Sequence, residues 1–235
     1  MKKNAPTKKQ QVAIFDIDGT IFRSSLLIEI TEALVQDGLF PVKARDIYAQ
    51  SYENWSNRKD SYDKYIHEVI RAFEKYIKTV RRQDYLRIAK KVMAFHQNRV
   101  YRFTRDLVKD LKKKNYFLLA ISHSPRELVE LFANNLGFDK VYGRVYESDD
   151  SGKFTGKTLY ADLISDKAKI LHRALKKNNL PLRGSIGVGD SEGDISLLKL
   201  VDRPICFNPN SKLYRQAKRA GWEIVVERKD VVYKI

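Results

Sequence analysis

The sequence predicts an α/β protein with a doubly wound, Rossmann-like parallel-sheet core and an inserted α-helical cap. Two observations support this fold class. Between residue 101 and the end of the chain, short apolar runs typical of buried strands alternate with helical patterns, which favours parallel strands joined by helices. A first apolar run at residues 12–15 is separated from the others by a helical stretch over residues 22–100. A chain of 235 residues can hold one domain with such an insertion.

The first part of the chain is expected to contain a tail, a strand and the cap. Residues 1–10 are polar and basic and should form a flexible tail. The β-prone run at residues 12–15 stops at a loop, so residues 11–21 are assigned to the core together with residues 101–235. Over residues 22–100, apolar side chains recur at three- and four-residue spacing, which predicts a helical cap. Its aromatic stripe is expected in the core of a helical bundle: Tyr62, Tyr65, Phe73 and Tyr76.

The second part of the chain should alternate between strands and helices. Strands are predicted at residues 116–121, 140–145, 185–188, 204–207 and 223–226. Helices are predicted at residues 104–113, 125–136, 166–177, 195–200 and 212–220, with Thr104 and Ser124 as the N-caps of the first two. Residues 147–157 are rich in turn-forming residues and are expected to be a connection.

The charge balance limits the choice of partners. Lys and Arg number 45 against 29 Asp and Glu, a formal net charge of +16, which attracts anionic partners such as phosphorylated small molecules, nucleic acid or an anionic membrane surface. Lysines at helix ends, such as residues 112–114, complement the helix dipole and account for part of this charge without any partner. We therefore expect no obligate nucleic acid. Peripheral contact with an anionic membrane stays open, and the sequence contains no signal for an oligomeric state.

The cellular location follows from what the sequence lacks. Cys206 is the single cysteine, which excludes an internal disulfide framework and a multi-cysteine zinc site. No apolar run approaches the roughly 18 residues that span a bilayer, and the first residues lack the apolar region of a signal peptide. We expect a cytoplasmic protein.

Polar residues follow three of the predicted strands at the point where each strand ends. Because the carboxyl ends of parallel strands meet at one edge of the sheet, these residues should converge there. Their carboxylates would repel each other unless a cation lies among them, and oxygen ligands favour a hard ion, most plausibly Mg²⁺. Lys167, at the start of a predicted helix, would add a positive charge. The converging residues are Asp16, Asp18, Ser122, Asp190 and Asp194.

These residues lie in motifs that resemble those of the haloacid dehalogenase (HAD) superfamily. The four motifs are the run from Phe15 to Thr20 (FDIDGT), the strand that ends at Ser122, Lys167 with a leucine four residues later, and residues 189–194 (GDSEGD). They occur in the expected order and cover nearly the whole chain after residue 11. The helical insert, residues 152–157 and residues 208–222 are similar to subfamily IB, the phosphoserine-phosphatase-like hydrolases.

The resemblance implies a role for each motif residue. Asp16 would attack phosphorus and become an aspartyl-phosphate, while Asp18 would protonate the leaving alcohol and later activate water. Dehalogenases of the superfamily lack the second aspartate, so dehalogenation is not expected. Ser122 and Lys167 would bind the phosphoryl oxygens. Mg²⁺ would be held by the following groups: the side chains of Asp16 and Asp190, the backbone carbonyl of Asp18, and Asp194 directly or through water.

The substrate is predicted less sharply than the chemistry. Arg23 and Ser24 lie just after the first motif and are the expected contacts to the leaving group, together with Ser25, and His123 could also touch the substrate. Phosphoserine phosphatases usually have a glutamate where this chain has Ser25, and an asparagine where it has Gly193. L-Phosphoserine is therefore not favoured, and another small phosphomonoester, including one derived from a phospholipid, is expected.

The sequence thus predicts a Mg²⁺-dependent phosphatase that hydrolyses a small phosphomonoester through an aspartyl-phosphate. One alternative is a phosphomutase or phosphotransferase that uses the same intermediate and passes the phosphoryl group to an acceptor other than water. Another is a non-catalytic basic module that binds nucleic acid or a membrane surface, which only the net charge supports. The intact motif residues weigh against that module, because a vestigial site would not need them.

Overall fold

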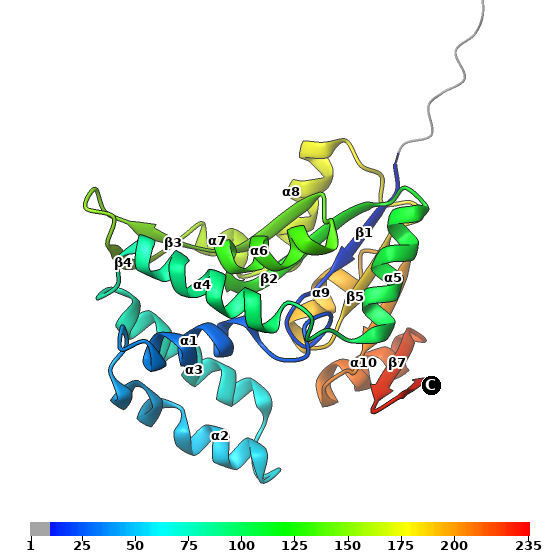
Figure 1. Cartoon of the computed structure of the whole chain (residues 1–235). Coiled ribbons are helices and arrows are strands. Elements are labelled where there is room, and N and C mark those ends of the chain that lie inside the picture. The colour runs from blue at the N-terminus through cyan, green and yellow to red at the C-terminus, as the bar shows by residue number, and fades with distance from the viewer. Residues whose placement is uncertain (1–9) are drawn as a thin grey trace, which may run out of the picture.

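An eight-stranded sheet forms the centre of the computed structural model, which describes residues 10–235 (Figure 1). Among these residues the strand order is β4-β3-β2-β1-β5-β6-β7-β8. The six central strands are parallel, whereas β4 and β8 pair antiparallel at the two edges. The strands are β1 (Val12–Phe15), β2 (Phe117–Pro125), β3 (Lys140–Ser148), β4 (Phe154–Leu159), β5 (Ile186–Gly189), β6 (Arg203–Phe207), β7 (Glu223–Arg228) and β8 (Val231–Lys234).

Helices fill the connections between the strands. After β1 come α1 (Leu26–Gln36), the 3₁₀ helix η1 (Val42–Ile47), α2 (Ala49–Ser56), α3 (Tyr62–Ile77), α4 (Arg82–His96) and α5 (Arg102–Lys113). Later come α6 (Arg126–Leu136), α7 (Ala161–Ile164), α8 (Lys167–Asn178), the 3₁₀ helix η2 (Glu192–Asp194), α9 (Ile195–Leu198) and α10 (Ser211–Ala220). The predicted fold class, a doubly wound α/β core with inserted helices, is confirmed.

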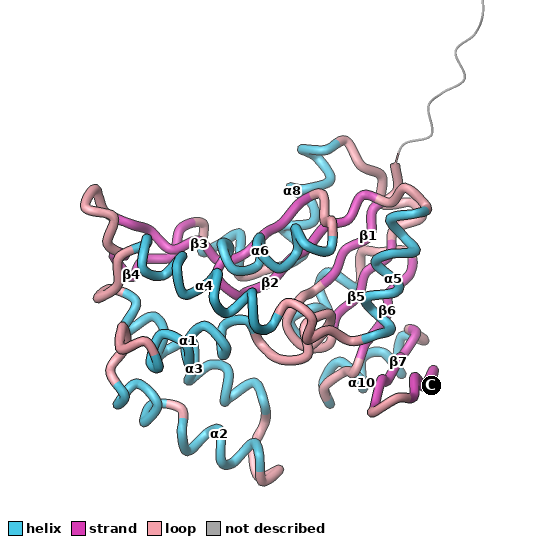
Figure 2. The backbone as a smooth tube through the Cα atoms, viewed as in Figure 1, coloured by secondary structure: helices cyan, strands magenta, loops and turns pink. Residues whose placement is uncertain are grey.

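Strand β1 is buried on both faces of the sheet. Ala13 and Phe15 face a hydrophobic cluster that includes side chains of α5 and α6, while Val12 and Ile14 face a second cluster with α8. This is why β1 consists of four consecutive apolar residues rather than an alternation of apolar and polar ones. Figure 2 shows β1 side by side with its neighbours β2 and β5.

The register of these three strands aligns their carboxyl ends. Phe15 pairs with Ala120 of β2 on one side and with Val188 of β5 on the other. Asp16, Ser122 and Asp190 each follow their paired residue by one or two positions and therefore emerge at the same edge. The strand order also reverses at β1, and such a switch point is where open parallel sheets bind ligands.

The helices between residues 22 and 100, called the helical segment below, share one hydrophobic cluster with the sheet. Phe73 of α3 contacts Tyr146 of β3 with ring centroids 5.2 Å apart, and Tyr85 of α4 contacts Phe154 of β4 at 5.5 Å. Packing against the β3–β4 hairpin therefore fixes the position of the helical segment. That the helical segment forms a separate cap domain stays a prediction. The predicted tail, apart from residue 10, lies outside the described residues.

The structure differs from the predicted elements at β4 and at β8. The turn-rich connection at residues 147–157 contains the start of β4, because a tight turn at Asp149 returns the chain onto β3. The Asp149 carboxylate closes that turn by accepting the backbone N–H groups of Ser151 at 3.0 Å and Lys153 at 2.9 Å. Strand β8 was not expected either, and it forms by pairing antiparallel with β7.

Thr104 is not the N-cap of α5. The helix begins earlier, at Arg102, and the Thr104 hydroxyl donates a hydrogen bond to the carbonyl oxygen of Thr20 at 2.9 Å. The first amides of α5 are satisfied from β7 instead, where the Glu227 carboxylate accepts the N–H of Arg102 at 3.1 Å and of Phe103 at 2.8 Å.

Among residues 10–235, none of the helices has both the length and the apolar character needed to span a bilayer.

The capping of α5 by Glu227 should contribute measurably to stability. Replacing Glu227 with alanine leaves two helix amides without their acceptor and removes a negative charge from a helix N-terminus, so unfolding should become easier by about 1 kcal/mol. Urea denaturation measures this difference. Glu223→Ala on the same strand is the control, because its ion pair with Arg203 is partly exposed and should be worth less than about 0.5 kcal/mol. Equal losses from the two variants would contradict the capping role.

Candidate active site

The loop after β1 turns sharply around Asp16, Asp18 and Gly19. The carbonyl oxygen of Ile17 accepts the N–H groups of Ile21 and Phe22, each at 2.9 Å, which closes the loop. Gly19 has a φ of +77°, and a Cβ atom there would lie 2.2 Å from Oδ2 of Asp190. Only glycine therefore allows the first loop and Asp190 to approach this closely.

Asp16 is a buried carboxyl group beside a buried ammonium. Its side chain is 6% exposed, and its Oδ1 accepts a hydrogen bond from Nζ of Lys167. Burial raises the pKa of Asp16 from 3.8 to about 7; Lys167 opposes this rise, and the carboxylates of Asp194 and Asp18 add to it. The negative form of Asp16 therefore depends on nearby positive charge.

Lys167 connects two of the carboxylates. It is the first residue of α8, and the preceding residue, Asp166, caps that helix by accepting the N–H of Ala168 at 2.9 Å. Its Nζ also donates to Oδ1 of Asp194 at 2.5 Å. Burial by itself would lower the pKa of Lys167, but the two carboxylates outweigh burial and raise it, so the ammonium stays charged.

Asp18 is held by hydrogen bonds at both oxygens. Oδ1 accepts the N–H of Leu26, the first residue of α1, at 2.5 Å, and Oδ2 accepts the hydroxyl of Ser122 at 2.5 Å. The Ser122 hydroxyl in turn accepts the N–H of Ser124 at 2.9 Å. Burial raises the pKa of Asp18, and the hydrogen bonds from Ser122 and Leu26 oppose that rise. Ser122 thus contacts Asp18 in this structure, and its contact with a phosphoryl group stays a prediction.

Ser124 does not cap α6 as the sequence suggested. The N-cap position belongs to Pro125, and the Ser124 hydroxyl accepts the N–H of Leu27 at 3.1 Å instead. The end of β2 therefore binds the N-terminus of α1. The sequence around Ser124 is compatible with a cap on α6 and with a bond to another helix. Because α1 lies nearby in the fold, the Ser124 hydroxyl binds the N–H of Leu27.

Asp190 and Asp194 form, together with Asp16, a cluster of three carboxylates that is called the acidic group below. Asp194 is fully buried, and its Oδ2 accepts the N–H groups of Asp190 and Ser191, each at 3.0 Å. A Cβ atom on Gly189 would lie 2.4 Å from Cγ of Asp194, so glycine is required for this arrangement. Burial and the neighbouring carboxylates of Asp16 and Asp194 raise the pKa of Asp190 well above its ordinary value.

Two cavities meet at this acidic group. The inner cavity has a volume of about 120 Å³, and its lining includes Asp16, Asp18, Lys167, Asp190 and His123. The outer cavity is larger, about 740 Å³, and the predicted contacts Arg23 and Ser24 line it. Burial, followed by the charge of Lys167, lowers the pKa of His123 to about 4, so the imidazole is neutral at neutral pH. Asp16, Asp18, Lys167, Asp190, His123, Arg23 and Ser24 thus line one or both of these adjacent cavities, whereas Ser122 and Asp194 line neither.

Helix α3 contributes side chains to the site, which the sequence pattern did not indicate. Tyr62, Ile66 and Ile70 line the inner cavity, whereas the aromatic stripe had been assigned to a bundle core. That assignment holds for Tyr65 and Phe73, which are buried, but Tyr62 is 37% exposed. Burial of its hydroxyl, followed by the charges of Asp18 and Asp190, raises the pKa of Tyr62. Helical spacing could not reveal this, because it marks a face without saying what lies opposite.

A family model described as haloacid dehalogenase-like hydrolase matches residues 13–199. The chain belongs to this family. The resemblance of its four motifs is therefore confirmed, as is the expected enzyme class at the level of a HAD hydrolase.

Individual relatives are more distant than the family match. This hydrolase is 22% identical over 223 residues to a histidinol-phosphatase of Neisseria meningitidis, covering 92% of this chain and 98% of the relative. A solved protein of unknown function from Bordetella pertussis Tohama I superposes with a TM-score of 0.74 at 18% identity, covering 92% and 98% of the two chains. A solved phospho-aspartyl intermediate analogue of phosphoserine phosphatase superposes with a TM-score of 0.63 at 21% identity, covering 95% and 96%. These structures share the fold of this hydrolase.

The acidic group has the composition of a site for a hard divalent cation. Asp16, Asp190 and Asp194 each offer a carboxylate oxygen, and these oxygens lie within 4.8 Å of one another. The burial and mutual repulsion that raise the pKa values of Asp16 and Asp190 would be relieved by a bound dication. Oxygen-only ligands suit Mg²⁺ better than zinc, which prefers nitrogen and sulfur.

Mg²⁺ should stabilise this hydrolase more at neutral than at acidic pH. The pKa of Asp16 rises from 3.8 to about 7 on folding, so without metal the folded protein loses stability as the pH rises between these values. A bound dication offsets that loss, while protons compete with it at acidic pH. Excess Mg²⁺ should therefore raise the melting temperature more at about pH 7.5 than at about pH 5.5.

Differential scanning fluorimetry at the two pH values measures this effect. Asp190→Asn should abolish the shift because it removes a carboxylate of the acidic group. Asp150→Asn, at an exposed position away from both cavities, should preserve it. A Mg²⁺ shift of equal size in all three proteins would indicate binding elsewhere.

Proposed function

We propose that the protein is a Mg²⁺-dependent phosphatase that hydrolyses a small phosphomonoester through an aspartyl-phosphate on Asp16. The observation that carries the proposal is the pair of carboxyl groups at the end of β1, one against an ammonium and the other against a hydroxyl, facing one cavity. The ammonium of Lys167 favours the ionised Asp16 that must attack phosphorus. The buried Asp18, with its raised pKa, suits a group that carries a proton.

The two carboxyl groups divide the reaction into two displacements. An oxygen of Asp16 forms a bond to phosphorus as the bond from phosphorus to the leaving oxygen breaks, and Asp18 donates its proton to that oxygen. In the second step Asp18 takes a proton from a water molecule, whose oxygen bonds to phosphorus. The bond from phosphorus to Asp16 then breaks, which releases inorganic phosphate and restores both carboxyl groups.

Neighbouring residues orient these groups. Ser122 and the N–H of Leu26 fix the two oxygens of Asp18, and Lys167 lies where it can neutralise charge on Asp16 and on a phosphoryl oxygen. Asp194 holds Lys167 through one oxygen and the chain at Asp190 through the other. Asp16 and Asp190, with the backbone carbonyl of Asp18 and support from Asp194, would hold Mg²⁺. A bound Mg²⁺ ion supplies positive charge to the phosphoryl oxygens.

The relatives are consistent with this proposal. The Neisseria protein is named a histidinol-phosphatase, and the solved phosphoserine phosphatase is described as a phospho-aspartyl intermediate analogue. Both names refer to phosphomonoester chemistry, and the second refers to an aspartyl intermediate. They support the reaction class for this chain and do not specify its alcohol.

Replacing Asp16 with asparagine should abolish turnover while preserving the fold. The amide has the same shape but cannot attack phosphorus, so release of phosphate from 4-nitrophenyl phosphate with Mg²⁺ should fall by more than about a hundredfold. The exposed control Asp150→Asn should retain activity. Circular dichroism checks that both variants are folded. Retention of activity in a folded Asp16→Asn protein would remove Asp16 as the nucleophile.

Replacing Asp18 with asparagine should slow the second displacement more than the first for a good leaving group. 4-Nitrophenolate leaves without a proton, whereas the attacking water still needs a base. The variant should therefore accumulate a phosphoenzyme, detected as added phosphoryl mass in the intact protein, and Asp16→Asn in the same background should eliminate it. Transfer of the phosphoryl group to an added alcohol in preference to water would instead indicate a phosphotransferase.

A further inference from the structure

We propose that the outer cavity selects phosphomonoesters whose alcohol is flat and apolar and carries a second anionic group. This inference concerns the substrate class and rests on the proposed phosphatase function. It follows from the size of the outer cavity, its aromatic wall and the charges of its lining.

The outer cavity adjoins the inner one. Tyr62 and Asp190 line both spaces. A phosphoryl group placed against Asp16 would therefore direct its alcohol past Tyr62 into the outer cavity. The inner cavity, at about 120 Å³, has little room beyond the phosphoryl group, whereas 740 Å³ is typical of sites for drug-sized ligands. The space thus exceeds what a three-carbon alcohol would fill.

Aromatic rings from α2 and α3 form one wall of the outer cavity. Trp55 and Tyr65 are stacked with ring centroids 5.5 Å apart and an interplanar angle of 12°. The ring centroid of Tyr52 lies 5.3 Å from that of Tyr65, and the ring centroid of Tyr62 lies 5.3 Å from that of Trp55. All four rings line the cavity. Such a wall provides flat apolar area and favours an aromatic or similarly planar alcohol.

The charged groups in the lining are mostly positive. Arg23, Arg58 and Arg99 line the outer cavity, and Asp190 is its only acidic lining residue within the described part of the chain. Arg99 is paired with Glu29 at 2.8 Å. Arg23 lies over the ring of Tyr101 at 5.3 Å, and among residues 10–235 neither Arg23 nor Arg58 forms an ion pair with a carboxylate. Two guanidinium groups therefore remain available for an anion.

The carboxylates that line the two cavities, those of Asp16, Asp18 and Asp190, all belong to the proposed catalytic and metal site, which leaves none dedicated to an ammonium group. Glu29, the acidic residue closest in sequence to Ser25, is occupied by Arg99 at 2.8 Å and His96 at 3.2 Å, and it lines neither cavity. Ser25 itself is buried and carries no charge. An amino group in the substrate would face more positive than negative charge, since Asp190 is the one acidic residue among the described lining residues of the outer cavity. A carboxylate or a second phosphate would instead be complementary to Arg23 and Arg58.

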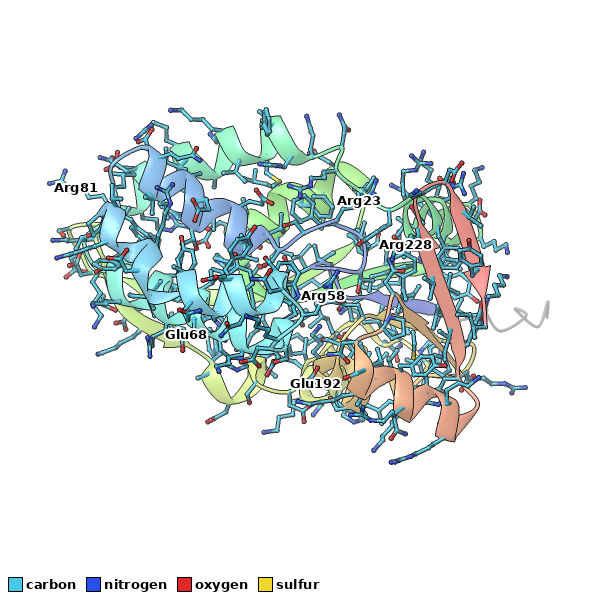
Figure 3. The ribbon with its side chains drawn as sticks, turned by 90° about the horizontal axis from the view of Figure 1, so that it is seen from below. Arg23, Arg58, Glu68, Arg81, Glu192 and Arg228 are labelled. Atoms are coloured by element: carbon cyan, nitrogen blue, oxygen red, sulfur yellow. The ribbon has the colours of Figure 1, made fainter. Side chains whose placement is uncertain are left out.

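Arg58 lies just after the C-cap of α2, in the left-handed conformation that often follows the end of a helix. Figure 3 shows Arg58 and Arg23 toward the middle of the molecule.

Three matched esters test the charge preference. They are 4-(carboxymethyl)phenyl phosphate, its neutral carbamoylmethyl analogue and the cationic 4-(aminomethyl)phenyl phosphate; the methylene group insulates the ring, so their leaving groups stay similar. We expect kcat/KM to be greatest for the anionic ester, roughly tenfold to a hundredfold above the neutral one, and lowest for the cationic one. Equal values for the three esters, or a preference for the cationic ester, would overturn the proposal.

Arginine variants locate the source of the preference. In the double variant Arg23→Gln, Arg58→Gln, the ratio of kcat/KM between the anionic and neutral esters should fall to about one, because the anion loses both guanidinium partners. The matched control, Arg81→Gln with Arg228→Gln, removes the same charge at exposed positions outside the outer cavity and should keep the wild-type ratio (Figure 3). Equal ratios in the two double variants would show that net charge, and not the cavity, causes the preference.

Binding of the free alcohol separates this inference from the phosphatase proposal. Trp55 lines the outer cavity, so its fluorescence should change when 4-hydroxyphenylacetate binds and change less with 4-hydroxyphenylacetamide. Trp55→Phe identifies the signal of Trp55 against that of Trp222. Selective binding without turnover of any phosphate ester would refute the phosphatase function and retain the anion site. Turnover that depends on Asp16, without selective binding or charge preference, would refute the anion site alone.

Discussion

The ion pairs of Lys167 with Asp16 and Asp194 are the interaction on which the rest of the site depends. The ammonium is 3% exposed, and a buried charge of this kind is stable only when opposite charges surround it. It joins the end of β1, the start of α8 and the segment after β5, which are far apart in the sequence. Asp194 also binds the backbone at Asp190, so one buried carboxylate fixes both the cation and the neighbouring acid. The site is therefore a single electrostatic unit and not a set of independent side chains.

The parallel sheet supplies the frame for this unit. Its register places the residues after β1, β2 and β5 at one edge, and two glycines allow the approach of Asp190 to the first loop and of Asp194 to the end of β5. The helical segment closes the other side. It is anchored to the site by the bonds from Leu26 to Asp18 and from Leu27 to Ser124, and to the sheet by aromatic contacts. The proposed chemistry and the proposed substrate selection are thus assigned to two adjacent cavities, the first at the ends of β1 and β5 and the second lined largely by the helical segment.

The net charge of +16 has a more specific meaning once the cavities are considered. Many of the basic residues lie in exposed pairs with acidic ones, such as Arg87 with Asp37, and say little about partners. Arg23 and Arg58 differ because they line the outer cavity and have no carboxylate partner among the described residues. Local complementarity to an anionic substrate, and not overall charge, is the feature that the structure connects to the proposed function.

The sequence by itself determined the fold class, the main strands and the residues of the acidic group, because each of these depends on local order. Apolar runs mark buried strands, and a residue that directly follows a strand must emerge at its end. The tertiary structure decided which distant groups meet. Ser124 and Thr104 have the chemistry of helix caps but bind Leu27 and Thr20, while Glu227 caps α5 from a strand more than a hundred residues away. Tyr62 belongs to an apolar stripe by its spacing, yet in the folded chain it lines the same cavity as the carboxyl groups of Asp16 and Asp18. Hydrogen bonds and ion pairs form between neighbours in space, and local sequence patterns do not specify those neighbours.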